Sequence, residues 1–485
     1  MLNSIKKTFL IFATMLICGN TIAQESSVKQ VAKGYNINIQ IDNLADSTIY
    51  LGYYYGDKQY VKDTLVLDNE CRGVFSGEKP LAEGIYFVLV PGNTIFELMI
   101  GEEQNFSIST KYTGEASDLT KCLKATGNPD VEMYVDYQQF MMNQNAVAME
   151  LRKRIPTAKS AEKKIINDSL DLLFNQVKSL WNDIETNHSK SLLAAVLRIN
   201  KDVDIPDFPR DEKGNVLDSA FQYKFYKKHY FDYVDFQDPR LLHTQFYQPK
   251  LDRYFEKMIH QSPDTIIKES REILAKTEGC EEMFRFTLQT IFNKYNNSNI
   301  MGMDKVLVFF GDEYYLNGKA TWADSAWLAK LEERVAELRY NQVGNQAVEL
   351  HLYTYDDEPI TISEINANFT VLFFFEPTCG HCKKTTPKMK EFSDKYWEKG
   401  VEILAIYTQT DKNEWGEFIK AQGLENWKNA WDPHNQTGFR LFYDIRSTPS
   451  IYLLDKNKKI LAKRIDVETL QLIIDDELKR MNKIN

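Results

Sequence analysis

The chain lacks an excess of basic residues. Its 59 Lys and Arg are outnumbered by 69 Asp and Glu, which gives a formal net charge of −10 over 485 residues. Proteins that bind mainly nucleic acid or anionic lipid carry clustered positive charge, so neither is expected as a partner. The mean hydropathy of −0.43 excludes a polytopic membrane protein. The 26 Tyr and 28 Phe exclude a disordered chain, because they supply ample core-forming bulk.

Motifs for nucleotides, metals and organic cofactors are also missing. There is no phosphate-binding P-loop, no dinucleotide-binding glycine pattern and no internal repeat. The histidines of the central region, His188, His229, His243 and His260, do not have the spacing of metal ligands. We therefore expect no metal and no cofactor.

Cysteine is scarce, with six residues in the whole chain, so this is not a disulfide-stapled scaffold. After Cys18, the remaining five are Cys71, Cys122, Cys280, Cys379 and Cys382. An odd number leaves at least one thiol unpaired. The sequence leaves open whether Cys71 and Cys122 form a bridge or are small buried side chains. Only Cys379 and Cys382 have a spacing with chemical meaning.

The N-terminus has the pattern of a secretory signal peptide over residues 1–23. Lys6 and Lys7 precede an apolar run from Phe9 to Ile17, and Thr21-Ile22-Ala23 fits a cleavage site. The run is too short for a membrane span, which needs about 20 residues. We expect export to the periplasm or cell envelope and a net charge of −12 after cleavage. A lipoprotein anchored through Cys18 is the alternative. Ile17 counts against it, because lipoprotein processing favours a small residue just before the cysteine.

The length predicts about three domains, and the sequence pattern changes twice. Residues 24–128 read as a β-rich, sandwich-like domain, because Tyr35, Ile37, Ile39 and Ile41 alternate with polar residues and turn signals recur as in an antiparallel sandwich. Residues 129–340 read as a helical domain, since apolar residues recur at steps of three and four. Residues 341–485 alternate strands with helices and form an α/β domain.

The chemistry lies in this last domain. A continuous apolar run, Thr370 to Phe375, predicts a central strand, and the helix-compatible stretch from Lys383 to Lys399 follows it. Between them stands Cys379-Gly380-His381-Cys382. This order places Cys379 at a helix N-terminus, where unpaired N–H groups and the helix dipole stabilise a thiolate and lower its pKa. The second cysteine, one turn deeper, can attack a mixed disulfide.

The order of elements resembles the TlpA/ResA-type family of thiol-disulfide oxidoreductases, which have a thioredoxin fold. The likeness covers residues 341–485 and is carried by Phe373 to Cys382, by Pro387 in the following helix and by Thr448-Pro449. It implies a redox-active disulfide between Cys379 and Cys382. It also implies a cis Thr448–Pro449 bond that lies against the cysteines and helps to dock substrate. The two upstream regions resemble, more loosely, the domains that precede such modules in envelope proteins.

The sequence departs from this pattern in two ways. Phe373 stands where many thioredoxins have a buried aspartate, so Glu376 is the nearest carboxyl group. Glu376 is either an acid or base toward Cys382 or a solvent-facing turn residue. Gly380-His381 matches the isomerase type of motif. We expect His381 to stabilise the thiolate and to raise the potential from the thioredoxin value of about −270 mV toward about −180 mV.

Other interpretations of the two cysteines fit less well. A zinc site needs a second ligand pair, a purely structural disulfide would be strained within one helical turn, and a peroxiredoxin needs a different spacing. The sequence therefore predicts an exported thiol-disulfide oxidoreductase, of reductase or isomerase type, that acts on protein substrates with an unidentified electron donor. The rival hypothesis is an envelope binding or scaffold protein in which the thioredoxin-like unit is a redox-responsive accessory.

Overall fold

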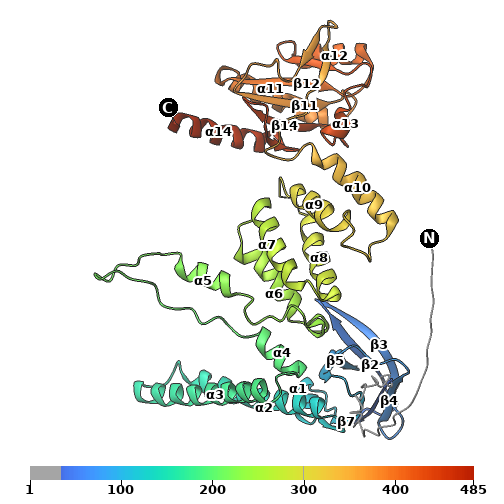
Figure 1. Cartoon of the computed structure of the whole chain (residues 1–485), viewed down its shortest axis with the longest axis vertical. Coiled ribbons are helices and arrows are strands. Elements are labelled where there is room, and N and C mark those ends of the chain that lie inside the picture. Colours follow the sequence, from blue (N-terminus) through green and yellow to red (C-terminus); the bar gives the residue numbers. More distant parts are fainter. Residues whose placement is uncertain (1–33, 299, 485) are drawn as a thin grey trace, which may run out of the picture.

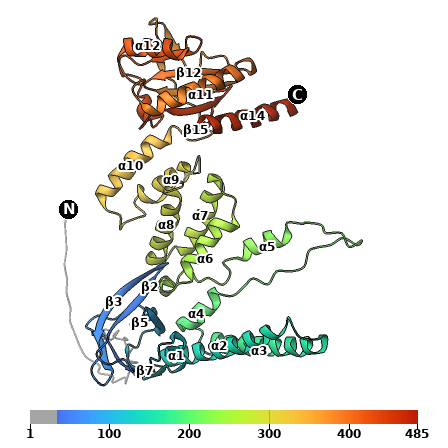
Figure 2. The same ribbon diagram turned by 180° about the vertical axis from the view of Figure 1, so that it is seen from behind.

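The computed structural model describes residues 34–298 and 300–484. The predicted signal peptide and Cys18 lie outside these residues. Three regions follow one another along the long axis of the molecule: β-sheets at one end, helices in the middle and an α/β unit at the other end (Figures 1 and 2). The predicted fold class is thereby confirmed, while the domain boundaries at residues 128 and 340 stay predictions.

Two four-stranded sheets form the N-terminal region. Their strand orders are β4-β1-β7-β8 and β3-β2-β5-β6. The elements are β1 (Tyr35–Asp42), β2 (Thr48–Tyr55), β3 (Lys58–Val66), β4 (Arg72–Gly77), β5 (Gly84–Val90), β6 (Thr94–Ile100), β7 (Asn105–Lys111), α1 (Ala116–Lys121) and β8 (Lys124–Thr126). The alternating side chains of β1 are buried between the sheets, as predicted. The expectation of purely antiparallel pairing is wrong at one place, because β7 returns from the other sheet and pairs with β1 in parallel.

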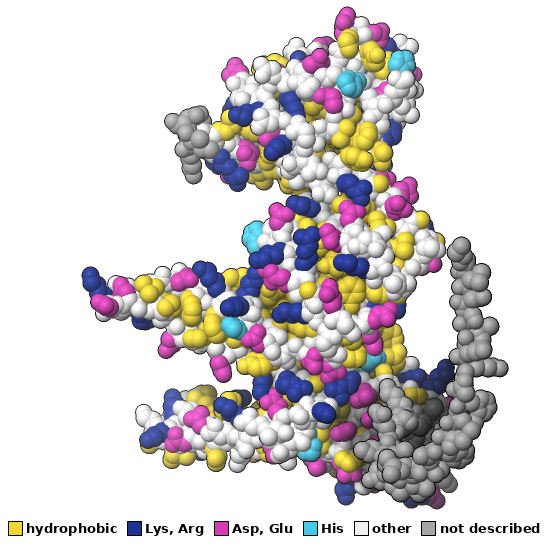
Figure 3. Space-filling model, viewed as in Figure 1, with side chains coloured by type: hydrophobic (Ala, Val, Ile, Leu, Met, Phe, Trp, Pro, Cys, Tyr) yellow, Lys and Arg dark blue, Asp and Glu magenta, His cyan; other side chains and the backbone are white. Residues whose placement is uncertain are grey.

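The middle region is helical. Its elements are α2 (Pro129–Arg154), α3 (Ser160–Asn187), α4 (Leu192–Ile199), α5 (Phe221–His229), η1 (Pro239–His243), α6 (Tyr247–Arg253), η2 (Tyr254–Met258), α7 (Pro263–Thr277), α8 (Glu281–Asn296), α9 (Asp304–Phe310), η3 (Gly311–Tyr315) and α10 (Ser325–Arg339). The α2–α3 hairpin and the segment around α5 project on the same side of the molecule (Figure 3). Within the described residues, no helix combines the length and the apolar character needed to cross a membrane.

The tip of the β2–β3 hairpin joins the first region to the second. The Gly56 N–H donates to the Leu242 carbonyl at 2.8 Å, and the Asp57 N–H donates to the Gln248 side chain at 2.9 Å. Gly56 has a φ of +62°, and a Cβ atom there would collide with Gln248 and Phe286. The close approach of the hairpin to the helices therefore requires glycine at this position.

A seven-stranded sheet of order β10-β9-β13-β12-β11-β14-β15 organises the C-terminal region. The elements are β9 (His351–Thr354), β10 (Pro359–Thr361), β11 (Phe369–Phe375), α11 (Gly380–Tyr396), η4 (Trp397–Lys399), β12 (Val401–Tyr407), α12 (Lys412–Gln422), β13 (Lys428–Trp431), α13 (Phe439–Phe442), β14 (Ser450–Asp455), β15 (Ile460–Lys463) and α14 (Val467–Ile484). Strand β11 pairs in parallel with β12 and antiparallel with β14, and all of its residues are buried. The predicted central strand is confirmed.

Ion pairs connect the helical region to this last unit. Arg334 of α10 and Arg464, which follows β15, both contact Oδ2 of Asp444, the former at 2.8 Å, and Arg446 contacts Oδ1 at 2.9 Å. Lys463, which is buried, donates to Asp304 of α9 at 2.5 Å and to Asn341 at 2.6 Å. The side chain of Asp444 is 1% exposed, so its charge depends on these guanidinium partners.

The substitution Asp444→Asn tests this junction. Asparagine tolerates the φ of +46° at this position but removes the charge that three arginines share. We expect the free energy of unfolding to fall by about 3 kcal/mol, as when one partner of a buried ion pair is lost. Urea unfolding followed by circular dichroism measures it. The control is Asp394→Asn, which breaks a surface pair with Lys390 and should cost less than about 0.5 kcal/mol. Equal losses in both variants would contradict the assigned role of Asp444.

Candidate active site

The two cysteines stand at the point where the buried strand β11 passes into helix α11. After Phe375 the chain makes a short turn through Pro377 and Thr378, and Cys379 is the N-cap residue of the helix. The first turn of α11 therefore contains the rest of the motif, and its free N–H groups point toward the sulfur of Cys379. This is the arrangement that the sequence predicted.

Cys379 lies in an environment that favours its thiolate. Burial raises the pKa of Cys379, but the N–H and the thiol of Cys382, together with the N–H of His381, lower it below its ordinary value. The thiol also lies 3.2 Å from the carbonyl oxygen of Thr448. Its side chain is only partly buried, so a disulfide of another molecule can approach the sulfur.

Cys382 differs from Cys379 although it is only three residues away. It is completely buried, and burial raises the pKa of its thiol to about 12. Both sulfurs are free thiols, and the predicted disulfide between them stays a prediction. The pair thus combines an accessible, acidic thiol with a buried, protonated one.

Thr448 and Pro449 lie against the cysteines, as the resemblance implied, and the bond between them is cis. The hydroxyl of Thr448 donates to Oε1 of Glu376 at 2.6 Å, while Gln409 donates to Oε2 at 2.5 Å. The carboxylate of Glu376 is therefore held by Thr448 and Gln409. Sequence reasoning missed Gln409, although its position just after β12, the parallel neighbour of β11, was a usable signal.

Three comparisons connect this geometry to known proteins. Residues 343–463 match the AhpC/TSA family, and residues 199–341 match a domain of unknown function, DUF5106. The thiol-disulfide oxidoreductase ResA of Bacillus cereus is 28% identical over 130 residues, which is 26% of this chain and 72% of ResA. ResA of Halalkalibacterium halodurans is 25% identical over 134 residues, or 27% of this chain and 73% of that protein.

The C-terminal unit is a ResA-like thioredoxin domain.

Two solved structures are also similar to this chain. A domain of a possible thiol-disulfide isomerase from Cytophaga hutchinsonii is 34% identical and covers 29% of this chain and 96% of its own, with a TM-score of 0.28. A thioredoxin-like protein from Bacteroides caccae is 20% identical and covers 57% of this chain and 98% of its own, with a TM-score of 0.42.

The remaining predicted residues of the ResA-like domain have distinct surroundings. The side chain of His381 is exposed and makes no hydrogen bond to the described residues. Phe373 is fully buried and stacks on Phe375 at 5.5 Å, so the aspartate position of other thioredoxins is apolar here. Cys71, Cys122 and Cys280 are free thiols outside the ResA-like domain. Within the described ranges, no group of three or more His, Cys, Asp or Glu side chains is arranged to hold a metal ion.

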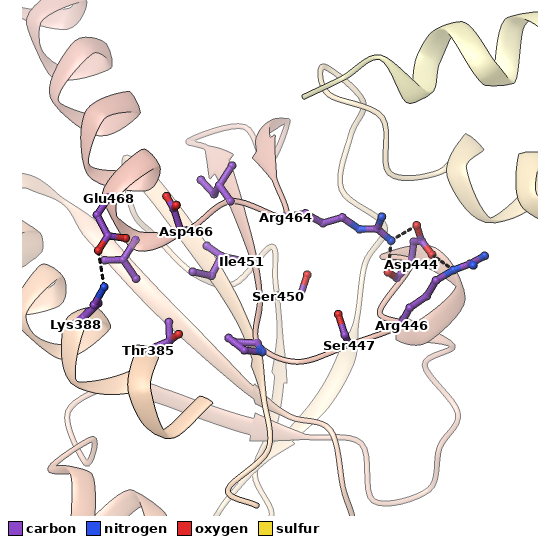
Figure 4. A pocket seen from close by; sticks show the side chains of 13 residues that line it. Thr385, Lys388, Asp444, Arg446, Ser447, Ser450, Ile451, Arg464, Asp466 and Glu468 are labelled. Carbon is purple, nitrogen blue, oxygen red and sulfur yellow. Dashed lines mark hydrogen bonds and ion pairs between the residues drawn. The ribbon is translucent and has the colours of Figure 1, made fainter. Parts of the chain in front are cut away.

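A groove of about 540 Å³ opens beside Pro449. Figure 4 shows Lys388 and Glu468 on one side of it, and Arg464, Asp444 and Arg446 on the other. The backbone next to it is unpaired. Within the described chain, three groups lack a hydrogen-bond partner: the N–H and the C=O of Ser447 and the N–H of Thr448. These groups can pair with an extended polypeptide.

The asymmetry of the two thiols predicts selective alkylation. In the reduced protein, the rate of iodoacetamide modification at Cys379 should rise with pH through a midpoint below about 8.5, the value of a free cysteine, because its pKa is lowered. Cys382 should stay unmodified up to pH 9, because its pKa is about 12. Peptide mass spectrometry measures both rates. In urea-unfolded protein the difference should vanish, and equal profiles in the folded protein would contradict the assignment.

Proposed function

We propose that this protein is an exported thiol-disulfide oxidoreductase that exchanges disulfides with protein substrates through Cys379-Gly380-His381-Cys382. The observation that carries the proposal is the pairing of an accessible thiol of lowered pKa with a buried thiol of raised pKa under the Thr448–Pro449 loop. Such a pair supports a two-step exchange in which one sulfur meets the substrate and the other completes the reaction.

In the reductive direction, the thiolate of Cys379 attacks one sulfur of a client disulfide. A Cys379–client bond forms, and the other client sulfur leaves as a thiolate that takes up a proton. Cys382 then loses its proton and attacks the sulfur of Cys379, which releases the second client thiol and leaves a Cys379–Cys382 disulfide. Two electrons have passed to the client, and a dithiol donor restores the pair. The reverse sequence oxidises a client.

The surroundings of the cysteines support further roles in the proposed cycle. The free backbone groups of Ser447 and Thr448 dock an extended client segment beside Cys379. Glu376 tunes the site by holding the hydroxyl of Thr448, and His381 tunes it through the N–H that faces Cys379. The redox equivalents reside in the two sulfurs, so the proposed cycle uses no metal and no organic cofactor.

Export rests on the sequence of residues 1–23, with Lys6, Lys7 and the apolar run before Ala23. The proposed location is the periplasm or cell envelope, with a membrane anchor only if Cys18 is lipidated.

A scaffold role is the second candidate, and it is favoured by the α2–α3 hairpin. Leu172 and Phe174 of α3 are 59% and 66% exposed, and Val147 and Met149 of α2 and Ile165 of α3 are exposed as well. A surface rich in exposed apolar side chains is typical of a contact site. The ResA-like domain would then be an accessory to partner binding.

The substitution Cys379→Ser tests the enzymatic proposal. The variant should lose disulfide reductase activity on insulin by at least about 1,000-fold, because the attacking sulfur is gone. The matched control is Cys280→Ser, a partly buried thiol outside the ResA-like domain, which should keep full activity. Undiminished activity of Cys379→Ser would exclude the proposal.

The substitution Cys382→Ser separates the enzyme from the scaffold. Without the second sulfur, the mixed disulfide between Cys379 and a client cannot be resolved, so client proteins should accumulate on the variant as covalent adducts. Non-reducing electrophoresis of native envelopes with mass spectrometry identifies them. An empty trap, together with stable non-covalent partners, would favour the scaffold.

The substitution Glu376→Gln tests the tuning role. It removes the charge from two hydrogen bonds, and charged hydrogen bonds are about twice as strong as neutral ones. We expect kcat/KM for insulin reduction to fall roughly fivefold, with intact folding, because the loop with Thr448 is held less firmly. Glu391→Gln, an exposed position on α11, is the control. Equal activity of both variants would show that Glu376 is a passive turn residue.

A further inference from the structure

The groove beside Pro449 does not end within the ResA-like domain. A second cavity of about 580 Å³ shares Arg464, Ile465 and Asp466 with the first and continues to Asp304 and Leu307 of α9 and to Arg334 of α10. The volume of each cavity lies in the usual range for ligand sites, roughly 300–1,000 Å³. The two cavities therefore adjoin, and together they extend from Pro449, next to the loop that contacts Cys379, to the helical region.

The ion pairs of the groove leave a positive charge on one wall. Three guanidinium groups, those of Arg334, Arg446 and Arg464, meet two carboxylates, those of Asp444 and Glu337. The side chains of Arg446 and Arg464 are 57% and 38% exposed, so their unused N–H donors face the groove or the solvent. Guanidinium groups bind carboxylates through paired hydrogen bonds.

The opposite wall carries one ion pair and one carboxylate without an ion-pair partner among the described residues, that of Asp466, so the positive charge is confined to the arginine wall. Lys388 and Glu468 neutralise each other at 2.6 Å. Asp466 caps α14, because its carboxylate accepts from the Thr469 N–H at 2.7 Å and its negative charge is favoured at the helix N-terminus. Ile451 and Ile465 add apolar side chains to the lining of the groove.

We propose that this groove binds an extended segment of the client polypeptide that carries an acidic side chain, and that Arg446 and Arg464 receive this side chain. The inference rests on the proposed function, since the client is the chain whose disulfide meets Cys379. It adds a substrate preference and gives the helical region, through Arg334, a part in client choice. The unpaired backbone of Ser447 lies beside the groove and can pair with this segment.

The test uses the full reduced protein and three synthetic peptides. Each peptide carries one cysteine as a mixed disulfide with a neutral thiol, flanked by Glu, by Gln or by Lys residues, and the second-order rate of exchange is measured for each. Wild-type protein should react roughly tenfold faster with the Glu peptide than with the Gln peptide, as one charge-assisted hydrogen bond implies. The preference should weaken at high salt.

Variants of Arg446 test whether its guanidinium group receives the acidic side chain. Arg446→Gln should bring the ratio of the Glu to the Gln rate well below the wild-type value, and the double variant Arg446→Gln/Arg464→Gln should bring it to about one. Arg480→Gln is the control, because Arg480 is an exposed arginine of α14 that does not line the groove. A ratio of one in the wild type, or a ratio that Arg446 substitutions leave unchanged, would overturn the proposal.

The uncharged disulfide 2,2′-dithiodipyridine separates this inference from the proposed function. If wild-type protein fails to react with it through Cys379, the proposed function falls. If it reacts normally while the peptides show no charge preference, only the groove proposal falls.

Discussion

Burial of strand β11 is the constraint on which the rest of the C-terminal unit depends. Its side chains enter two cores, one on each face of the sheet: Phe373 and Phe375 on one face, Leu372 and Phe374 on the other. A strand that is apolar on both faces has to lie in the middle of a covered sheet. Its end is consequently fixed, and so is the start of the helix that follows it.

The chemical difference between the two cysteines follows from this placement. The first stands at the boundary between strand and helix, where backbone N–H groups are free and solvent is near. The second lies one turn further on, against the apolar core. No cofactor is needed to create the difference, because position along one turn of helix already produces opposite shifts of pKa.

Local pattern was enough to predict β11, the helix after it and the placement of Cys379 and Cys382 at the start of that helix, since the signals lie within about thirty adjacent residues. The cis Thr448–Pro449 bond came from family resemblance. The contact of Arg334 with Asp444 joins residues 110 positions apart, and that of Lys463 with Asp304 joins residues 159 positions apart. No periodicity reports such pairs, which depend on how whole regions pack. The parallel pairing of β1 with β7 was missed for the same reason.

The ion pairs at Asp444 determine how much of the chain is electrostatically complete by itself. A copy of the ResA-like domain that is cut near residue 343 leaves behind Arg334, Glu337 and Asp304, which pair here with its Asp444, Arg446 and Lys463. The transplanted copy would keep Asp444 with fewer cations around it and would expose Lys463, which is buried here. A copy that also carried α9 and α10 would keep these partners, so the electrostatically complete unit is larger than the catalytic one.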